Sequence, residues 1–166
     1  MTMTLVETIT VGSGGASSIE FTGIPQDGKD LVVTFSSRTA RVNSVGFVET
    51  QINALTSGYS YLYFYGDGSS VTSSSGGGNS WRWIYTNGDD STSNTFGSAQ
   101  LYFSNYSSSN AKSVSVDSVG ENNATAARAI LSANSHTTTA AITSIKFFET
   151  SYNLLEHTTA SLYTIS

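Results

Sequence analysis

The stretch Tyr59-Ser60-Tyr61-Leu62-Tyr63-Phe64-Tyr65 decides the fold of this chain. Tyrosine occupies every second position, so the tyrosine rings share one face of an extended segment, while Leu62 and Phe64 share the other. Alternation with a period of two indicates a β-strand rather than a helix. A second run repeats the arrangement after a glycine-rich segment, with aromatic side chains at Trp81, Trp83 and Tyr85. Two neighbouring aromatic strands are therefore predicted, each with its rings on one face.

The same alternation continues along the chain in both directions. It is clearest where one face is formed by Leu31, Val33 and Phe35. The first run is expected to share one face among Leu5, Ile9 and Val11, and a second strand begins at Ile19. Further strands are predicted at residues 44–49, 80–86, 96–104, 112–119, 127–133, 141–148 and 161–165.

Clusters of Gly, Ser, Asn and Asp separate these segments, which predicts an antiparallel β-sandwich of jelly-roll type with eight to eleven short strands. Two segments lie outside this pattern. Ser73–Gly78 is low in complexity and is expected to be a long exposed loop. Ala124–Leu131 is either a short helix or a tightly packed strand. Because strand-like sequence continues on both sides of the low-complexity segment, residues 1–166 are expected to form a single domain.

Composition excludes several classes of function. The net charge is −5, and the seven Lys and Arg residues are scattered singly, whereas nucleic-acid binding needs a clustered basic face. The chain has no cysteine, hence no disulfide framework and no thiolate site, and no apolar run approaches the length of a membrane span. Charged residues make up only 11% of the chain, against about 25% usually. Such a surface is either hydrated through its hydroxyls or covered by neighbouring subunits.

The sequence contains no recognisable catalytic or metal-binding motif. His136 and His157 lie in polar segments without metal-ligand spacing, and both are expected to be exposed turn residues. Asp67, Asp89 and Asp90 are the best candidates for a calcium site, but solvated turn acids are the preferred interpretation. No catalytic residue, metal or cofactor is therefore predicted, and the protein is not expected to be an enzyme.

The aromatic faces are the one feature that suggests a site. They comprise Tyr59, Tyr61, Tyr63, Tyr65, Trp81, Trp83 and Tyr85. These rings either form an inner face of the sandwich, strengthened by cross-strand aromatic pairs, or form a contact between subunits, or stack on the sugar rings of a glycan.

Three parts of the chain carry a resemblance to a known family. The first is Val11–Pro25 with Asp30–Val33, and the second is Ser60–Ser70. The third and most specific consists of Lys112–Ala126, Ala140–Ile145 and Ala160–Ile165. Together they resemble uncharacterised virion or tail-fibre-associated proteins of tailed phages, many of them marine. The resemblance implies a component of a phage particle and brings no catalytic residues.

The function expected from this resemblance is structural. We expect an exposed capsid decoration or knob protein that assembles as a homo-oligomer, most simply a trimer, and contacts other capsid or tail proteins in the virion. The alternative is a module at the tip of a tail fibre that binds a host glycan or receptor. Neither hypothesis involves nucleic acid or a membrane.

Overall fold

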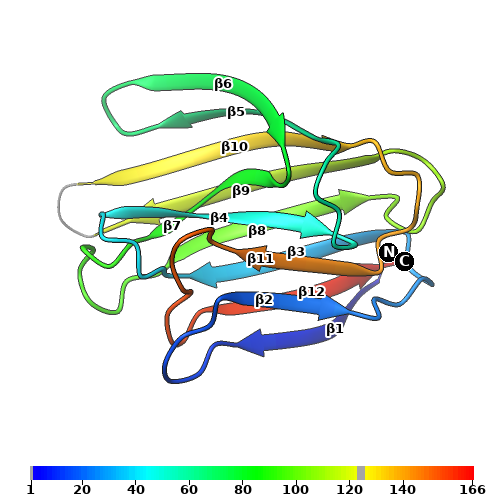
Figure 1. Cartoon of the computed structure of the whole chain (residues 1–166), viewed down its shortest axis with the longest axis horizontal. Helices are drawn as coiled ribbons and strands as arrows, with labels where there is room; N and C mark the ends of the chain where they lie inside the picture. The colour runs from blue at the N-terminus through cyan, green and yellow to red at the C-terminus, as the bar shows by residue number, and fades with distance from the viewer. Residues whose placement is uncertain (1, 123–125) are drawn as a thin grey trace.

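The computed structural model describes residues 2–122 and 126–166, whose regular structure is entirely β-strand. Two antiparallel sheets pack against each other (Figure 1). The eight-stranded sheet has the order β1 (Met3–Thr10), β12 (Thr159–Ile165), β3 (Asp30–Ser37), β8 (Gly97–Ser104), β9 (Lys112–Glu121), β10 (Ala127–His136), β5 (Tyr59–Gly66) and β6 (Val71–Gly78). The four-stranded sheet has the order β2 (Ser18–Thr22), β11 (Ser144–Phe148), β4 (Val45–Ile52) and β7 (Trp81–Asn87). The predicted antiparallel sandwich is confirmed, and its jelly-roll connectivity stays a prediction.

The main core fills the space between the two sheets. From β3, the predicted face of Leu31, Val33 and Phe35 points into it, and all three side chains are buried. From the other sheet, Phe147 of β11 stacks on Phe35, with ring centroids 5.2 Å apart. Alternation therefore identified the core-facing residues of β3 correctly, and Val32 on the opposite face is buried as well, at 5% exposed.

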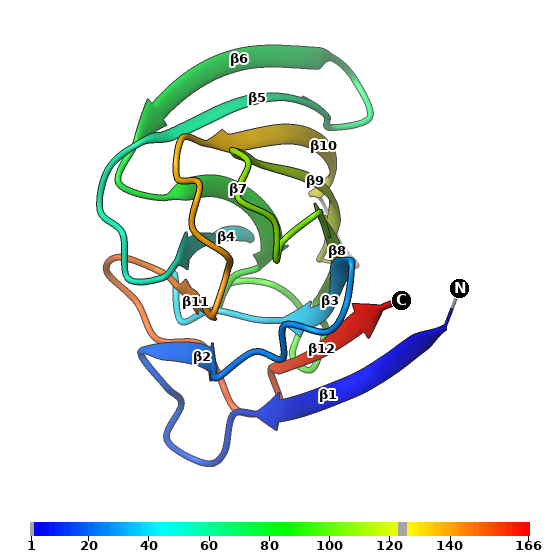
Figure 2. The same ribbon diagram turned by 90° about the vertical axis from the view of Figure 1, so that its right-hand side faces the viewer.

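The eight-stranded sheet curls around the smaller sheet, as Figure 2 shows. Its far end, β5 and β6, lies over β7, so that part of β5 packs on the edge of the four-stranded sheet. A second, smaller hydrophobic cluster forms there, separate from the main core. The curl brings the two aromatic runs of the sequence together.

β6 corrects one prediction. The segment expected as a long loop forms a strand from Val71 to Gly78, paired with β5 along its whole length. All of its residues are exposed, so no buried side chains mark it in the sequence. With this strand, residues 2–122 and 126–166 contain twelve strands, above the predicted eight to eleven.

β10 decides between helix and strand for most of the segment Ala124–Leu131. The segment expected as helix or strand is β-strand from Ala127 onward, and Ile130 is buried. Residues 124 and 125, where a helix would have begun, lie outside the described residues.

β1 corrects a third prediction. The register between β1 and β12 shifts between Leu5 and Glu7, which is a β-bulge. The extra residue reverses the alternation, so Leu5 is exposed whereas Val6 and Ile9 pack against the main core. Leu5 and Ile9 therefore lie on opposite faces, and the single face predicted for them is wrong.

Arg38 fixes the long connection between β7 and β8. Its buried guanidinium donates to the carbonyl oxygens of Thr92, Thr95, Asp89 and Ser91, at 2.7 to 3.1 Å. These bonds satisfy both the buried cation and the turn carbonyls.

No helix in the described part of the chain is long and apolar enough to span a bilayer.

Candidate functional site

The structure divides the predicted aromatic residues between two environments. Tyr59 and Trp81 belong to the main core, where they are 3% and 2% exposed and their rings meet edge to face at 5.2 Å. Both polar groups are satisfied there: the Tyr59 hydroxyl accepts a hydrogen bond from the Ile52 amide, and the Trp81 indole donates to the Ser135 carbonyl. These two residues form part of an inner face of the sandwich.

His136 completes this corner of the core and corrects the prediction of an exposed turn residue. It is 4% exposed at the end of β10, with its ring 4.4 Å from the Tyr59 ring. Its Nδ1 accepts from the Thr138 amide, so Nε2 carries the proton and donates to the Ser57 carbonyl. Burial lowers the pKa of His136 below its ordinary value. His157, by contrast, is exposed as predicted.

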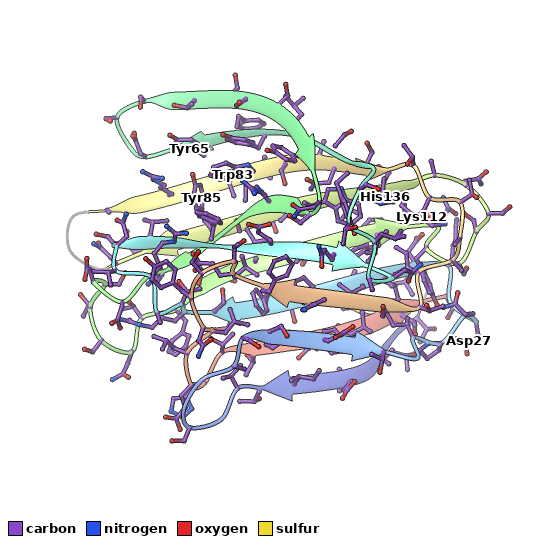
Figure 3. All side chains as sticks on the ribbon, viewed as in Figure 1. Asp27, Tyr65, Trp83, Tyr85, Lys112 and His136 are labelled. Carbon is purple, nitrogen blue, oxygen red and sulfur yellow. The ribbon has the colours of Figure 1, made fainter. Side chains whose placement is uncertain are left out.

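Lys112 stands directly opposite His136 in the pairing of β9 with β10, and Figure 3 shows the two side chains at the same end of the sandwich. Lys112 is 2% exposed, and its amine donates to the Ser108 carbonyl at 2.5 Å. Burial lowers the pKa of this lysine. The sequence showed Lys112 only as one scattered charge, because nothing local to it signals burial.

The remaining aromatic residues form what we call the aromatic cluster: Tyr61, Tyr63 and Tyr65 from β5, Trp83 and Tyr85 from β7, and Phe47 from β4. The closest pair is Tyr63 with Trp83, whose ring centroids lie 4.8 Å apart. Tyr63 and Tyr85 are buried, whereas the other four rings are only half-buried. Tyr65, Trp83 and Tyr85 lie between β5 and β7 in Figure 3.

Arg128 of β10 closes one side of the aromatic cluster. Its guanidinium lies over the rings of Tyr65 and Tyr85, at 5.1 and 5.4 Å from their centroids. It also lies 3.3 Å from the Tyr85 hydroxyl, to which it donates. Burial raises the pKa of Tyr85, and the arginine opposes that shift. The cluster is thus a packed aromatic surface with a cation over its rings.

Trp83 has an unusual backbone within this cluster. Arg82 and Trp83 of β7 stand opposite the single residue Glu49 of β4, which makes a bulge in β7, and Trp83 has a φ of 80°. Because the bulge adds one residue, Trp81 points into the main core while Trp83 and Tyr85 point into the aromatic cluster. The single face predicted for these three residues is therefore wrong at Trp81. The buried indole nitrogen of Trp83 has no hydrogen-bond partner among the described residues.

The opposite face of β5 carries a feature that the sequence reasoning missed. Leu62 and Phe64 point away from both clusters and are 57% and 49% exposed. They line a groove across the outer face of the eight-stranded sheet, together with Leu131 of β10. The only sequence signal was that these two apolar residues lie opposite the tyrosines, and alternation alone cannot tell which of two apolar faces is buried.

Two buried carboxyl groups lie on the four-stranded sheet and its flank. Glu49 of β4 accepts hydrogen bonds from the hydroxyls of Ser80 and Thr150. Glu149, just after β11, accepts from the Arg41 guanidinium at 2.6 Å. Burial raises the pKa of Glu149, although Arg41 opposes this shift. Glu49 thus ties the segments at Ser80 and Thr150 to β4, whereas Glu149 joins the end of β11 to the loop that precedes β4.

The candidate calcium ligands lie in turns. Asp67 closes the turn between β5 and β6 by accepting from the amides of Ser69 and Ser70, and these bonds lower its pKa. Asp89 and Asp90 are exposed. Among the described residues, no three His, Asp or Glu side chains are grouped to hold a metal ion.

Comparison with known protein families, curated proteins and solved structures returned no match. The resemblance to virion proteins of tailed phages therefore stays a prediction.

Proposed function

We propose that this protein is an exposed, non-enzymatic structural component of a phage particle, and that it assembles with copies of itself through the edge strand β6. The family resemblance supports the particle. The observation that supports self-assembly is the chemistry of β6, which is the last strand of the eight-stranded sheet and is exposed along its whole length.

An edge strand presents unpaired amide and carbonyl groups to solvent, and natural proteins usually protect it with charges, proline or a bulge. β6 has none of these: it consists of one valine, one threonine, three serines and three glycines. β1, at the other edge of the same sheet, has both a bulge and Glu7. The contrast favours β6 as the edge that another chain covers.

Two glycines let β6 lie close to β5. A Cβ atom on Gly77 would lie 2.6 Å from the Tyr59 carbonyl oxygen, and one on Gly76 would lie 2.7 Å from the Tyr61 hydroxyl. The glycines are thus needed for packing on β5. Their consequence is an edge without side chains at these positions, to which a second strand can approach closely.

The symmetry follows from which strand pairs with β6. Pairing with β6 of a second copy is isologous and closes as a dimer, whereas pairing with β1 of the next copy can close as a ring such as the expected trimer. Either arrangement extends the sheet across the subunit contact and covers a nearly uncharged edge.

Two lysines on β6 test the proposal. Thr72→Lys with Ser74→Lys places like charges on the edge, on the side of β6 away from the outer groove, and should convert the oligomer to monomers. Light scattering after gel filtration gives the mass of each form, and the wild-type mass separates dimer from trimer. The control, Ser60→Lys with Ser113→Lys, adds the same charge at exposed positions of the interior strands β5 and β9 and should leave the mass unchanged.

A wild-type protein that stays monomeric as its concentration rises would contradict self-assembly. An oligomer that survives the lysines in β6 would place the contact elsewhere. Cryo-electron microscopy of the phage particle tests the remaining part, since density for this fold on the capsid or tail is expected.

A further inference from the structure

The outer face of the eight-stranded sheet, which points away from the four-stranded sheet, is hollowed by a groove. Its main part has a volume of about 770 Å³ and continues into a second hollow of about 390 Å³. Both volumes fall in the range of small-molecule sites in proteins. Four side chains line both parts and so mark the middle of the groove: Phe64, Gln100, Asp117 and Leu131.

The strand register shows how the groove is built. One row of directly opposed residues crosses seven strands on the outer face: Ser161, Thr34, Gln100, Asp117, Leu131, Phe64 and Ser73. The next row has mostly small side chains, namely Thr159, Ser36, Ser98, Val119, Ala129, Gly66 and Val71. Seven strands cover six spacings of about 4.8 Å, so the groove runs for roughly 29 Å. Its shape suits an extended chain that crosses the strands.

The chemistry of the groove changes along its length. Towards β10, β5 and β6 the lining is apolar, and Phe64, Leu131 and Val71 are 49%, 51% and 76% exposed. Towards β8, β3 and β12 the lining carries hydroxyl and amide groups from Ser98, Gln100, Thr34, Ser36, Thr159 and Ser161. Such a lining fits a ligand that has both apolar faces and many hydroxyl groups.

The charge of the groove lining disfavours an anionic ligand. Among the described residues that line the two hollows, Asp117 is the only acidic one, and no lysine or arginine is present. An anionic chain such as a sulfated or phosphorylated polymer would meet an acid and no cation, in a protein whose net charge is −5. A neutral ligand meets no such repulsion.

We propose that this groove binds a neutral, linear polysaccharide chain. Phe64 provides the ring on which the apolar face of one sugar packs, and Leu131 extends that surface. Gln100 and Asp117 lie beside them in the same row and exchange hydrogen bonds with sugar hydroxyls, with Asp117 accepting. The site lies on the opposite face of β5 from the aromatic cluster, so it does not use the tyrosines or tryptophans.

Binding to neutral polysaccharides tests the proposal directly. Wild-type protein is run through gels that contain a soluble glucan, mannan or xylan, and is applied to an array of neutral glycans, with a sulfated galactan as the anionic comparison. At least one neutral polysaccharide should retard the protein, and the sulfated one should not. Phe64→Ala and Asp117→Ala should each weaken binding about tenfold, the size of effect expected for a central contact.

The matched control is Val42→Ala, because Val42 is 71% exposed and lies outside the groove. It should bind as the wild type does, and circular dichroism should show the same fold for all variants. The lysines on β6 leave the groove lining intact and should also preserve binding, which separates this site from the proposed subunit contact.

Two results would overturn the proposal. The first is that no neutral polysaccharide retards the protein in the gel and that the protein binds no glycan on the array. The other is a groove covered by a second copy of this chain, which would appear as a change in mass caused by Phe64→Ala or Asp117→Ala.

Discussion

The main core and the aromatic cluster are built from similar alternating strands, yet they differ in depth. In the main core Phe147 is 0% exposed, because both sheets cover it. In the aromatic cluster only Tyr63 and Tyr85 are buried, because β5 covers the cluster on one side and the other side is the edge of a four-stranded sheet. The burial of a side chain therefore depends on what packs across from its strand, and not on the alternation of residues within the strand.

The composition of the two regions follows this difference. The main core consists mostly of aliphatic side chains and phenylalanine, and the polar groups of its Tyr59, Trp81 and Tyr106 are all hydrogen-bonded to backbone. The aromatic cluster consists mainly of tyrosines, whose hydroxyls can face water or a cation while the rings stay packed, together with Trp83 and Phe47. Arg128, which lies over two of its rings, occupies that intermediate position between core and surface.

The largest expected effect on stability comes from creating a cavity in the main core. Phe147→Ala removes a ring that stacks on Phe35 and meets Phe21 edge to face, and should lower the free energy of unfolding by about 3–5 kcal/mol. Tyr65→Ala, in the half-buried part of the aromatic cluster, should cost about 1 kcal/mol. Urea denaturation measures both. Equal losses would contradict this prediction and would mean that the two regions are equally well packed.

A smaller effect is expected at Trp83, whose backbone lies in the left-handed region. Trp83→Ala removes the ring and leaves a side chain at a φ of 80°, whereas Trp83→Gly removes the ring and tolerates that φ. The glycine variant should therefore be more stable than the alanine variant by about 1 kcal/mol in urea denaturation. If alanine is the more stable, the bulge in β7 relaxes when the ring is lost, and the strain came from the ring's packing.

The same comparison explains what could be predicted from the sequence. Central strands such as β8 and β9 could be placed, because their residues alternate between a buried face and a more exposed face. β6 could not, since its exposed serines and glycines carry no pattern. The bulges in β1 and β7 each shift the alternation by one residue, and a bulge leaves no mark in composition.

The candidate site shows the same limit. Tyr59 to Tyr65 were identified as one face of a strand, and the structure places all four on the inner side. The groove needs side chains from strands far apart in the sequence, such as Thr34, Gln100 and Leu131, which only the register brings into one row. No local window contains that information.

The smallest expected effect concerns His136, at the corner where the main core meets the aromatic strands. Its pKa is lowered by burial, so the unfolded chain binds a proton more readily just below pH 6.5. The stability contributed by neutral His136 is therefore complete above pH 6.5 and is lost as the pH falls through the lowered pKa. His136→Gln should flatten this decline in urea midpoints measured between pH 7.5 and 5.5, and the exposed His157→Gln should not.

The pH dependence of wild-type stability does not by itself isolate the contribution of His136, because Glu149 contributes with the opposite sign. Its pKa is raised by burial above the ordinary 4.5, so its contribution is complete below pH 4.5 and is lost as the pH rises. The groups that face His136 are the rings of Tyr59 and Trp81 and, across the strand pair, Lys112, whose pKa is also lowered by burial. The difference between His136→Gln and wild type cancels the slope of Glu149, which both proteins share. If that difference stays constant with pH, His136 does not titrate as a buried group, and this corner of the main core admits water.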